Sequence, residues 1–153
     1  MYKQVLMIAL TVTMLSCKNS EEKKEQIKIG DYAAATNEGN TQSELEMSIS
    51  RGKEVYSDFC VQCHMPNGKG IPSNFPPLAG SNWLVEKREE SIHAVKYGQN
   101  GEITVNGIKY NGVMTPMGLS EKEVADVLNY TMNSWGNEQE KMITVDEVKA
   151  VTK

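Results

Sequence analysis

The sequence predicts an all-α domain in which four or five short helices are joined by loops, with one small β-hairpin among them. Two patterns indicate this class. Apolar residues recur at helical spacing behind serine or threonine caps, and an Asn-Gly pair separates two short β-branched runs. A third observation concerns the interior. Phe and Trp number only 2 each, so we expect something other than side chains to help fill the core.

Length and charge limit the classes of protein to which the chain can belong. Its 153 residues suit one folded domain, and its formal net charge of -4 is far from the basic balance typical of nucleic-acid binding. The longest apolar run, residues 5–15, is shorter than the roughly 18 residues that a membrane-spanning helix needs. We therefore expect neither a nucleic-acid partner nor a transmembrane segment.

Residues 1–16 are predicted to be a signal peptide. Lys3 supplies a positive start, residues 5–15 supply the apolar stretch, and Ser16 is a small residue before Cys17. This arrangement resembles a lipoprotein signal, which is cut just before the cysteine. Acylation of Cys17 would then anchor the mature chain to a membrane. Ordinary secretion is the alternative, but no A-x-A cleavage site follows the apolar stretch.

Residues 17–46 are expected to form the lipidated cysteine and a flexible acidic tether. Residues 18–46 carry four lysines and seven acids among polar residues, a composition that cannot bury enough apolar surface to fold. A tether of this kind lets a folded domain move near the membrane. The domain itself is assigned to residues 47–136, and residues 137–153 are assigned to a C-terminal extension.

The domain is predicted to open with a helix that leads straight into Cys60. Apolar residues recur at helical spacing from residue 47, and Ser48 or Ser50 is the expected cap. Residues 65–79 hold four prolines and two glycines, which predicts a loop with little regular structure.

Two short helices, a hairpin and two capped helices complete the predicted order. The short helices are expected near residues 83–87 and 92–96, and the second ends before a glycine. Asn106-Gly107 predicts a type I′ turn between strands at 103–105 and 108–110. The next helix has a Ser120 to Glu123 capping box. Its apolar face is expected to hold Val124, Val127, Leu128, Thr131 and Trp135, before Gly136 ends it.

A short terminal helix within residues 137–153 is predicted from a second capping pattern. Thr144 and Glu147 have the same spacing as the first box. The apolar face of this helix would hold Val145, Val148 and Val151.

The motif that carries chemistry is Cys60-Val61-Gln62-Cys63-His64. A C-x-x-C-H sequence is typical of covalent attachment of c-type haem. Two thiols three positions apart at the end of a helix can add to the two vinyl groups of haem, and the following imidazole can reach the iron. The three cysteines of the chain are then accounted for, one by lipid and two by thioethers.

Two other chemistries fit the motif less well. A structural zinc site needs four ligands, and the domain offers only Cys60, Cys63, His64 and His93, without a second cysteine pair. A thioredoxin-type redox pair would need a βαβ setting, whereas here a helix runs into a proline-rich loop. We therefore favour haem.

A second iron ligand is expected from the C-terminal half of the domain. The candidates are Met114 and Met117, because a methionine opposite a histidine raises the potential of haem. We favour Met114, since the spacing to the Ser120 cap leaves room for a strand-like segment to cross the haem edge. Met117 is more readily explained as core packing. His93 lies in a helical pattern and is not expected to be a ligand.

Residues 47–136 resemble a class I, monohaem cytochrome c. The resemblance rests on the attachment motif, on Gly52 and Tyr56 ahead of it, and on Pro76-Pro77-Leu78-Ala79-Gly80, which is similar to the family's P-x-L-x-G loop. In the family that proline carbonyl accepts a hydrogen bond from the proximal histidine, so Pro76 would orient His64. The family's axial methionine is commonly followed by proline, whereas Thr115 follows Met114 here, so Met117 stays an alternative.

The resemblance implies an electron carrier rather than an enzyme. Two protein ligands would fill both axial positions of one haem c iron and leave no position for a substrate. The expected partners are a redox protein donor and acceptor, such as a respiratory complex, an oxidase or a periplasmic dehydrogenase. We expect a monomer on the extracytoplasmic side of a bacterial membrane. The alternative is a haem-based ligand sensor or peroxidase-like protein with a labile methionine.

Overall fold

The computed structural model describes residues 37–139 and 141–153. The predicted signal peptide, the predicted lipidation site Cys17 and the expected tether up to residue 36 lie outside the described residues. Within the described part, no helix is long and apolar enough to cross a membrane.

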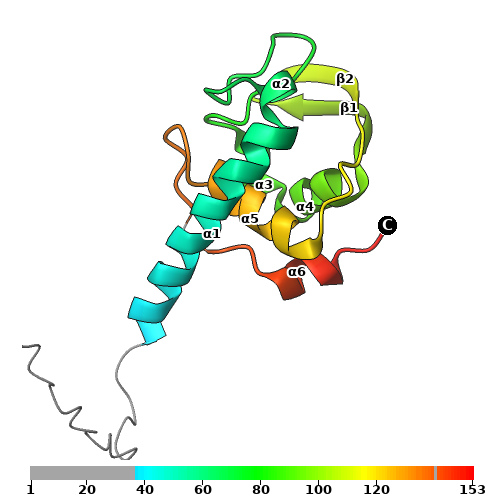
Figure 1. Cartoon of the computed structure of the whole chain (residues 1–153). Helices are drawn as coiled ribbons and strands as arrows, with labels where there is room; N and C mark the ends of the chain where they lie inside the picture. The colour runs from blue at the N-terminus through cyan, green and yellow to red at the C-terminus, as the bar shows by residue number, and fades with distance from the viewer. Residues whose placement is uncertain (1–36, 140) are drawn as a thin grey trace, which may run out of the picture. The chain divides into compact units, whose positions relative to one another are not determined.

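The described chain is mainly helical and contains one antiparallel pair of strands, which confirms the predicted all-α class with a small hairpin. Its elements are α1 (Asn37–Phe59), α2 (Val61–His64), α3 (Asn82–Glu86), α4 (Arg88–Tyr97), β1 (Gln99–Val105), β2 (Ile108–Met114), α5 (Glu121–Thr131) and α6 (Val145–Ala150). In Figure 1, α2 and the hairpin lie at one end of the domain and α6 at the other, with α5 between them.

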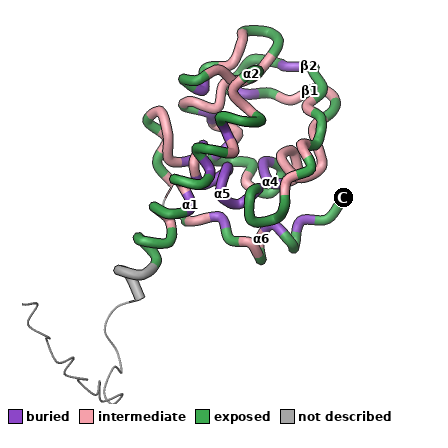
Figure 2. Tube along the Cα trace, viewed as in Figure 1, coloured by how far each residue is buried: buried purple, intermediate pink, exposed green. Residues whose placement is uncertain are grey.

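Helix α1 begins earlier than the sequence indicates. The predicted start was Ser48 or Ser50, but the helix runs from Asn37, so residues 37–46 of the expected tether are helical. Ser48 does not cap the helix. Its buried hydroxyl donates to Oδ1 of Asp126 at 2.6 Å. Figure 2 shows most of α1 from residue 41 to residue 47 as exposed, and an exposed helix has no apolar periodicity by which to recognise it.

Helices α1 and α5 pack closely across a glycine. A Cβ atom on Gly52 would lie 1.9 Å from the carbonyl oxygen of Asp126, so only glycine permits this approach. The Asp126 carboxylate accepts hydrogen bonds from Nε and Nη2 of Arg51 at 2.7 and 2.8 Å. The rings of Tyr56 and Tyr130 lie 5.4 Å apart across the same interface. These contacts fix the helix that leads into Cys60 against the middle of the domain.

Three of the predicted helix ends are present. Gly98 has a φ of 89° and ends α4. Ser120 and Glu123 form the capping box of α5. The hydroxyl of Thr144 accepts a hydrogen bond from the backbone nitrogen of Glu147 and caps α6.

The hairpin is longer than predicted. Asn106 and Gly107 have φ values of 50° and 77°, the left-handed conformations that a type I′ turn requires. Pairing continues to Gln99 and Met114 at the far end of the strands. Glycine and asparagine are depleted in strands, and both occur in the outer halves of β1 and β2, which is why the sequence pattern did not reveal them.

Helix α5 ends at Thr131, so the predicted continuation to Gly136 is wrong. Trp135 lies beyond the helix with a φ of 55°. Its ring packs 5.1 Å from that of Tyr56 and 5.4 Å from that of Tyr130. The apolar spacing continued past the helix because a turn returns Trp135 to the same cluster of aromatic rings.

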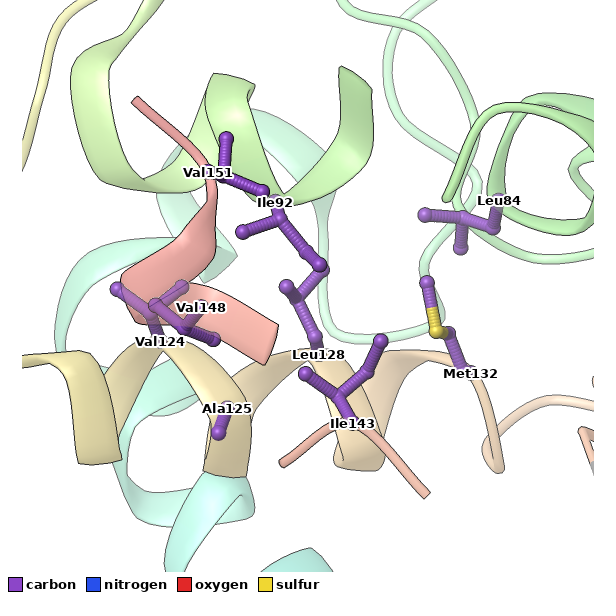
Figure 3. Close-up of a cluster of buried hydrophobic side chains, with 9 residues drawn as sticks. All are labelled: Leu84, Ile92, Val124, Ala125, Leu128, Met132, Ile143, Val148 and Val151. Atoms are coloured by element: carbon purple, nitrogen blue, oxygen red, sulfur yellow. The ribbon is translucent and has the colours of Figure 1, made fainter. Parts of the chain in front are cut away.

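The apolar core lies between α3, α4, α5 and the C-terminal segment. Figure 3 shows the side chains that fill it, Leu84, Ile92, Val124, Ala125, Leu128, Met132, Ile143, Val148 and Val151. None of them is an aromatic residue. The C-terminal segment therefore supplies part of this core and does not merely follow the domain.

Polar contacts join the same segment to the helices beneath it. The amide of Asn129 donates to the carbonyl of Ile143 and accepts from its backbone nitrogen, at 2.9 and 2.7 Å. Nζ of Lys96 donates to the carbonyls of Val148 and Val151 at 2.8 and 3.0 Å. Side chains of α4 and α5 thus form hydrogen bonds with backbone groups of α6 and of the residues on either side of it.

Candidate functional site

The three residues of the attachment motif lie where α1 ends and α2 begins. Cys60 continues the backbone hydrogen bonding of α1, since its nitrogen donates to the carbonyl of Tyr56 at 3.0 Å. The nitrogen of His64 donates to the carbonyl of Cys60 at 3.0 Å, so α2 forms a single turn that carries Cys63 and His64. The side chains of all three motif residues line one pocket.

The pocket is enclosed by the loop that contains residues 74–78, by α3, α4 and α5, and by the β1–β2 hairpin. Its walls are mainly apolar and include Pro76, Leu78, Trp83, Leu84, Val95, Ile103, Val105, Tyr110, Val127 and Leu128. From β1, alternate residues face the pocket, as expected for one side of a strand. A planar apolar group bound here would be covered on several sides by aliphatic and aromatic side chains.

His64 is held at one nitrogen by the loop. Its Nδ1 lies 3.1 Å from the carbonyl oxygen of Pro76, the contact that the family resemblance implies. A carbonyl only accepts hydrogen bonds, so Nδ1 carries the proton and Nε2 keeps a free lone pair. Burial lowers the pKa of His64, although the hydrogen bond to Pro76 acts in the opposite direction. The imidazole is therefore neutral and suited to bind a metal.

Gly70 allows the Pro76 carbonyl to come close to His64, a role that the sequence analysis missed. A Cβ atom on Gly70 would lie 2.3 Å from the carbonyl oxygen of Phe75 and 2.6 Å from that of Pro76. Its φ of 61° also favours glycine, and its nitrogen donates to the carbonyl of His64 at 3.0 Å. The only signal in the sequence was a glycine in a loop, which does not distinguish it from other glycines.

Two aromatic side chains hold the backbone just after His64. The hydroxyl of Tyr56 donates to the carbonyl of Met65 at 2.7 Å, and Nε1 of Trp135 donates to the carbonyl of Pro66 at 3.1 Å. Met65 has a φ of 64°, an unusual conformation for this residue type. These bonds keep the histidine turn tied to α1 and to the residues that follow α5.

The pair of thiols does not resemble a redox centre. Burial, and to a smaller extent the neighbouring Cys63, raises the pKa of the Cys60 thiol to about 11, whereas reactive thiols have a lowered pKa. The zinc alternative is also disfavoured. His93 is not among the residues that line the pocket, and its ring lies 5.2 Å from that of Tyr97. Among residues 37–139 and 141–153, no three His, Cys, Asp or Glu side chains are grouped to hold a metal ion.

Both candidate methionines line the pocket and are half-buried. Met114 is the last residue of β2. Gly98 approaches its backbone closely, since a Cβ atom added to Gly98 would lie 2.6 Å from the Met114 carbonyl oxygen. Met117 lies in the irregular segment between β2 and α5. The structure thus brings Cys60, Cys63, His64 and both methionines to one pocket.

This set of residues fits covalently bound haem. The pocket offers two thiols at the required spacing, a neutral imidazole oriented by a carbonyl, a thioether sulfur and apolar walls. Soft sulfur and imidazole are ligands that suit haem iron, and the apolar walls suit the porphyrin.

Comparison with known proteins agrees with this chemistry. The sequence model of the Cytochrome c family matches residues 49–135. One cytochrome c-552 of Thermus thermophilus is 40% identical over 114 residues, which cover 69% of this chain and 76% of that protein. A second cytochrome c-552 of Thermus thermophilus is 42% identical over 107 residues, which cover 64% of this chain and 81% of that protein.

A larger protein also contains a similar region. The cytochrome c subunit of an alcohol dehydrogenase (quinone) from Gluconacetobacter polyoxogenes is 27% identical over 133 residues, which cover 78% of this chain but only 26% of that subunit. The family match covers the attachment motif, the Pro76 loop and both methionines. The chain therefore belongs to the cytochrome c family, as a class I monohaem cytochrome c that carries covalently bound haem c and serves in electron transfer.

Proposed function

We propose that this cytochrome is a one-electron carrier in which Cys60 and Cys63 would hold haem c through thioethers and His64 and Met114 would be the two protein ligands of its iron. Haem c supplies a reversible one-electron couple when bound. The observation that supports this assignment is the single pocket that receives the two thiols, the oriented imidazole and a methionine at the end of a strand. The pocket residues keep the group dry and hold its ligands in place.

Met114 is the better of the two candidates because its backbone is anchored on two sides. It pairs with Gln99 in the sheet, and Gly98 lies against its carbonyl. Met117 follows Pro116 outside any regular element. A ligand that remains bound in both oxidation states benefits from a backbone that does not move, since less reorganisation accompanies each electron transfer.

If both His64 and Met114 bind the iron, no position would remain for a substrate, which supports a carrier rather than an enzyme. The donor and acceptor are proposed to be other redox proteins, because some relatives are cytochrome subunits of dehydrogenases. Docking would use the apolar rim of the pocket. Val113 and Phe59 line the pocket and are 67% and 45% exposed. Residues 47–136 carry eight basic and nine acidic residues, so we expect only weak dependence of docking on salt.

We also propose that the protein is a monomer tethered by a lipid on Cys17 to the extracytoplasmic face of a bacterial membrane. The support is the leader sequence and the chemistry of c-type haem attachment, which takes place outside the cytoplasm. Cys17→Ser should abolish the incorporation of labelled fatty acid that the wild-type holoprotein shows, without changing its spectrum. Wild-type protein found in the soluble fraction would contradict the anchor.

The decisive experiment is the visible spectrum of the holoprotein in both oxidation states, with and without carbon monoxide. Wild type should show the sulfur-to-iron charge-transfer band when oxidised and should not bind carbon monoxide at neutral pH. Met114→Ala should lose the band and bind carbon monoxide, while Met117→Ala, the matched control, should keep the band. The reverse result would assign Met117, and binding of carbon monoxide by wild type would favour a ligand sensor.

A further inference from the structure

The β1–β2 hairpin forms one wall of the haem pocket. Gln99, Gly101, Ile103 and Val105 of β1 line the pocket, whereas Glu102 and Thr104 between them are exposed. Strand β2 leads from the turn to Met114 at the pocket. The position of this hairpin therefore decides both how well the pocket is closed and where the proposed methionine ligand lies.

The hairpin depends on attachments to stay in place. It is a sheet of only two strands, and an isolated two-stranded hairpin is marginally stable in water. Its base is held where Gly98, at the end of α4, lies against the carbonyl of Met114. Its other end is the Asn106-Gly107 turn, which reaches the start of α3.

Two asparagine side chains join that turn to α3 in a reciprocal pair. The backbone nitrogen of Asn106 donates to Oδ1 of Asn82 at 2.7 Å, and the backbone nitrogen of Asn82 donates to Oδ1 of Asn106 at 2.9 Å. In addition, Nδ2 of Asn106 donates to the carbonyl of Gly80 at 3.0 Å. The next residues of α3, Trp83 and Leu84, line the pocket. This pair, which we name the asparagine latch, thus connects two walls of the same pocket.

We infer that Asn82 and Asn106 are positioning residues that hold the hairpin against α3 and so keep the methionine side of the haem closed to other ligands. The inference rests on the proposed His64 and Met114 ligation. Turn chemistry alone does not explain the side chain of Asn106. Its left-handed conformation would suit glycine equally well, yet the amide makes two contacts outside the turn.

Four variants distinguish the effect of the turn conformation from the effect of the hydrogen bonds of the asparagine latch. Asn106→Gly keeps a residue suited to the φ of 50° but removes the side chain of the latch. Asn106→Asp keeps the acceptor for Asn82 and places an oxygen where the donor to Gly80 stood. Asn82→Asp keeps the acceptor for Asn106 and should preserve the latch. Glu102→Gln breaks an exposed ion pair with Lys109 on the outer face of the same hairpin and serves as the matched surface control.

The measurement is the binding of imidazole to the oxidised, full-length holoprotein, followed by loss of the charge-transfer band. Asn106→Gly should bind imidazole about tenfold more tightly than wild type, as expected for the loss of a few exposed hydrogen bonds. Asn106→Asp should also bind it more tightly, whereas Asn82→Asp and Glu102→Gln should match wild type. Equal imidazole affinity in wild type and Asn106→Gly would overturn the inference.

A second control tests whether a general loss of stability, rather than loss of the asparagine latch, tightens imidazole binding. Val148→Ala removes methyl groups from the core at a residue that does not line the pocket, and it should lower the unfolding midpoint without tightening imidazole binding. If it tightens binding as much as Asn106→Gly does, the latch has no specific role. Amide hydrogen exchange of the hairpin gives a readout independent of the ligand set, and unchanged protection in Asn106→Gly would overturn the latch. Absence of the charge-transfer band in wild type would instead overturn the proposed ligation.

Discussion

The orientation of the His64 ring depends on one hydrogen bond, in which its Nδ1 donates to the carbonyl of Pro76 at 3.1 Å. That carbonyl in turn keeps its position because Gly70 has no side chain. A hydrogen bond to the outer nitrogen of a ligating histidine fixes its orientation and raises its basicity. A residue that never touches the haem can therefore change its potential.

Gly70→Ala tests this chain of contacts. The new Cβ atom would collide with the carbonyls of Phe75 and Pro76, so the hydrogen bond to His64 should lengthen and the reduction potential should rise. The free energy of unfolding should fall by at least about 2 kcal/mol. Both quantities can be measured on purified holoprotein by redox titration and urea unfolding.

Gly80→Ala is the matched control for Gly70→Ala. Gly80 has the same φ of 61°, but its added Cβ atom would meet nothing within 4 Å. It should cost only the roughly 1 kcal/mol of a left-handed alanine and leave the potential unchanged. An equal change of potential in both variants would refute the proposed role of Gly70.

The carboxylate of Asp126 should make stability depend on pH. Its side chain is 5% exposed. Burial alone would raise its pKa, but hydrogen bonds from Arg51, Lys122 and Ser48 outweigh burial and lower the pKa. Because the folded-state pKa is lowered, the stabilisation is complete above the unfolded pKa of about 3.9 and is lost as the pH falls through the folded-state value.

Asp126→Asn should therefore destabilise the protein by about 2 kcal/mol near neutral pH and reduce the loss of stability on acidification. Urea unfolding over a series of pH values measures both effects. Glu102→Gln, which breaks an exposed pair, should leave the pH profile as in wild type. A profile of Asp126→Asn parallel to that of wild type would contradict the assignment.

At the scale of elements, the C-terminal segment completes the core on the side away from the hairpin. Ile143 and Val148 are fully buried, and the guanidinium of Arg88 on α4 pairs with the carboxylate of Glu147 on α6. Segment and helices thus share both apolar and polar contacts. The C-terminal segment therefore contributes to stability without lining the pocket, although Leu84 and Leu128 belong both to the core and to the pocket wall.

Val148→Ala should lower the free energy of unfolding by roughly 2 kcal/mol and leave the reduction potential unchanged, since Val148 does not line the pocket. Val85→Ala on α3 is the control, because Val85 is 70% exposed and should have little effect on stability. A shift of potential in Val148→Ala would show that the two sides of the domain are coupled.

At the scale of the whole molecule, the bound group supplies core that the side chains do not. Phe and Trp number 2 each in the chain, and the packed cluster of Figure 3 holds only aliphatic side chains and a methionine. Apolar residues from the loop, α3, α4, α5 and the hairpin all face the pocket. Filling that pocket buries their surface and stabilises the fold.

Cys60→Ser combined with Cys63→Ser should consequently leave the domain largely unfolded. Circular dichroism of this variant during heating should show no cooperative transition. A cooperative transition near the wild-type temperature, in protein shown to lack haem, would contradict the role of the group in the core. Cys17→Ser, which alters the cysteine outside the domain, should melt like wild type.

The sequence by itself determined the features whose causes lie within a few residues. The C-x-x-C-H motif, the Asn106-Gly107 turn and the Ser120 to Glu123 capping box each depend on neighbouring positions. The turn and the capping box are present as predicted, and the motif indicated haem c, which the family match supports. Two errors have the opposite cause. Ser48 bonds to Asp126, 78 positions away, and Trp135 bonds to Pro66, 69 positions away, so the local pattern wrongly assigned Ser48 as a helix cap and Trp135 as part of α5.

Only the tertiary structure decided how the pocket is held together. Contacts of Gly70 with Pro76, of Gly98 with Met114 and of Asn82 with Asn106 join segments that local pattern treats as separate. A short motif is enough to predict the chemistry of the site, because bond formation to haem needs a few residues at fixed spacing. Its geometry depends on distant segments, because a pocket closes only when the chain packs against itself.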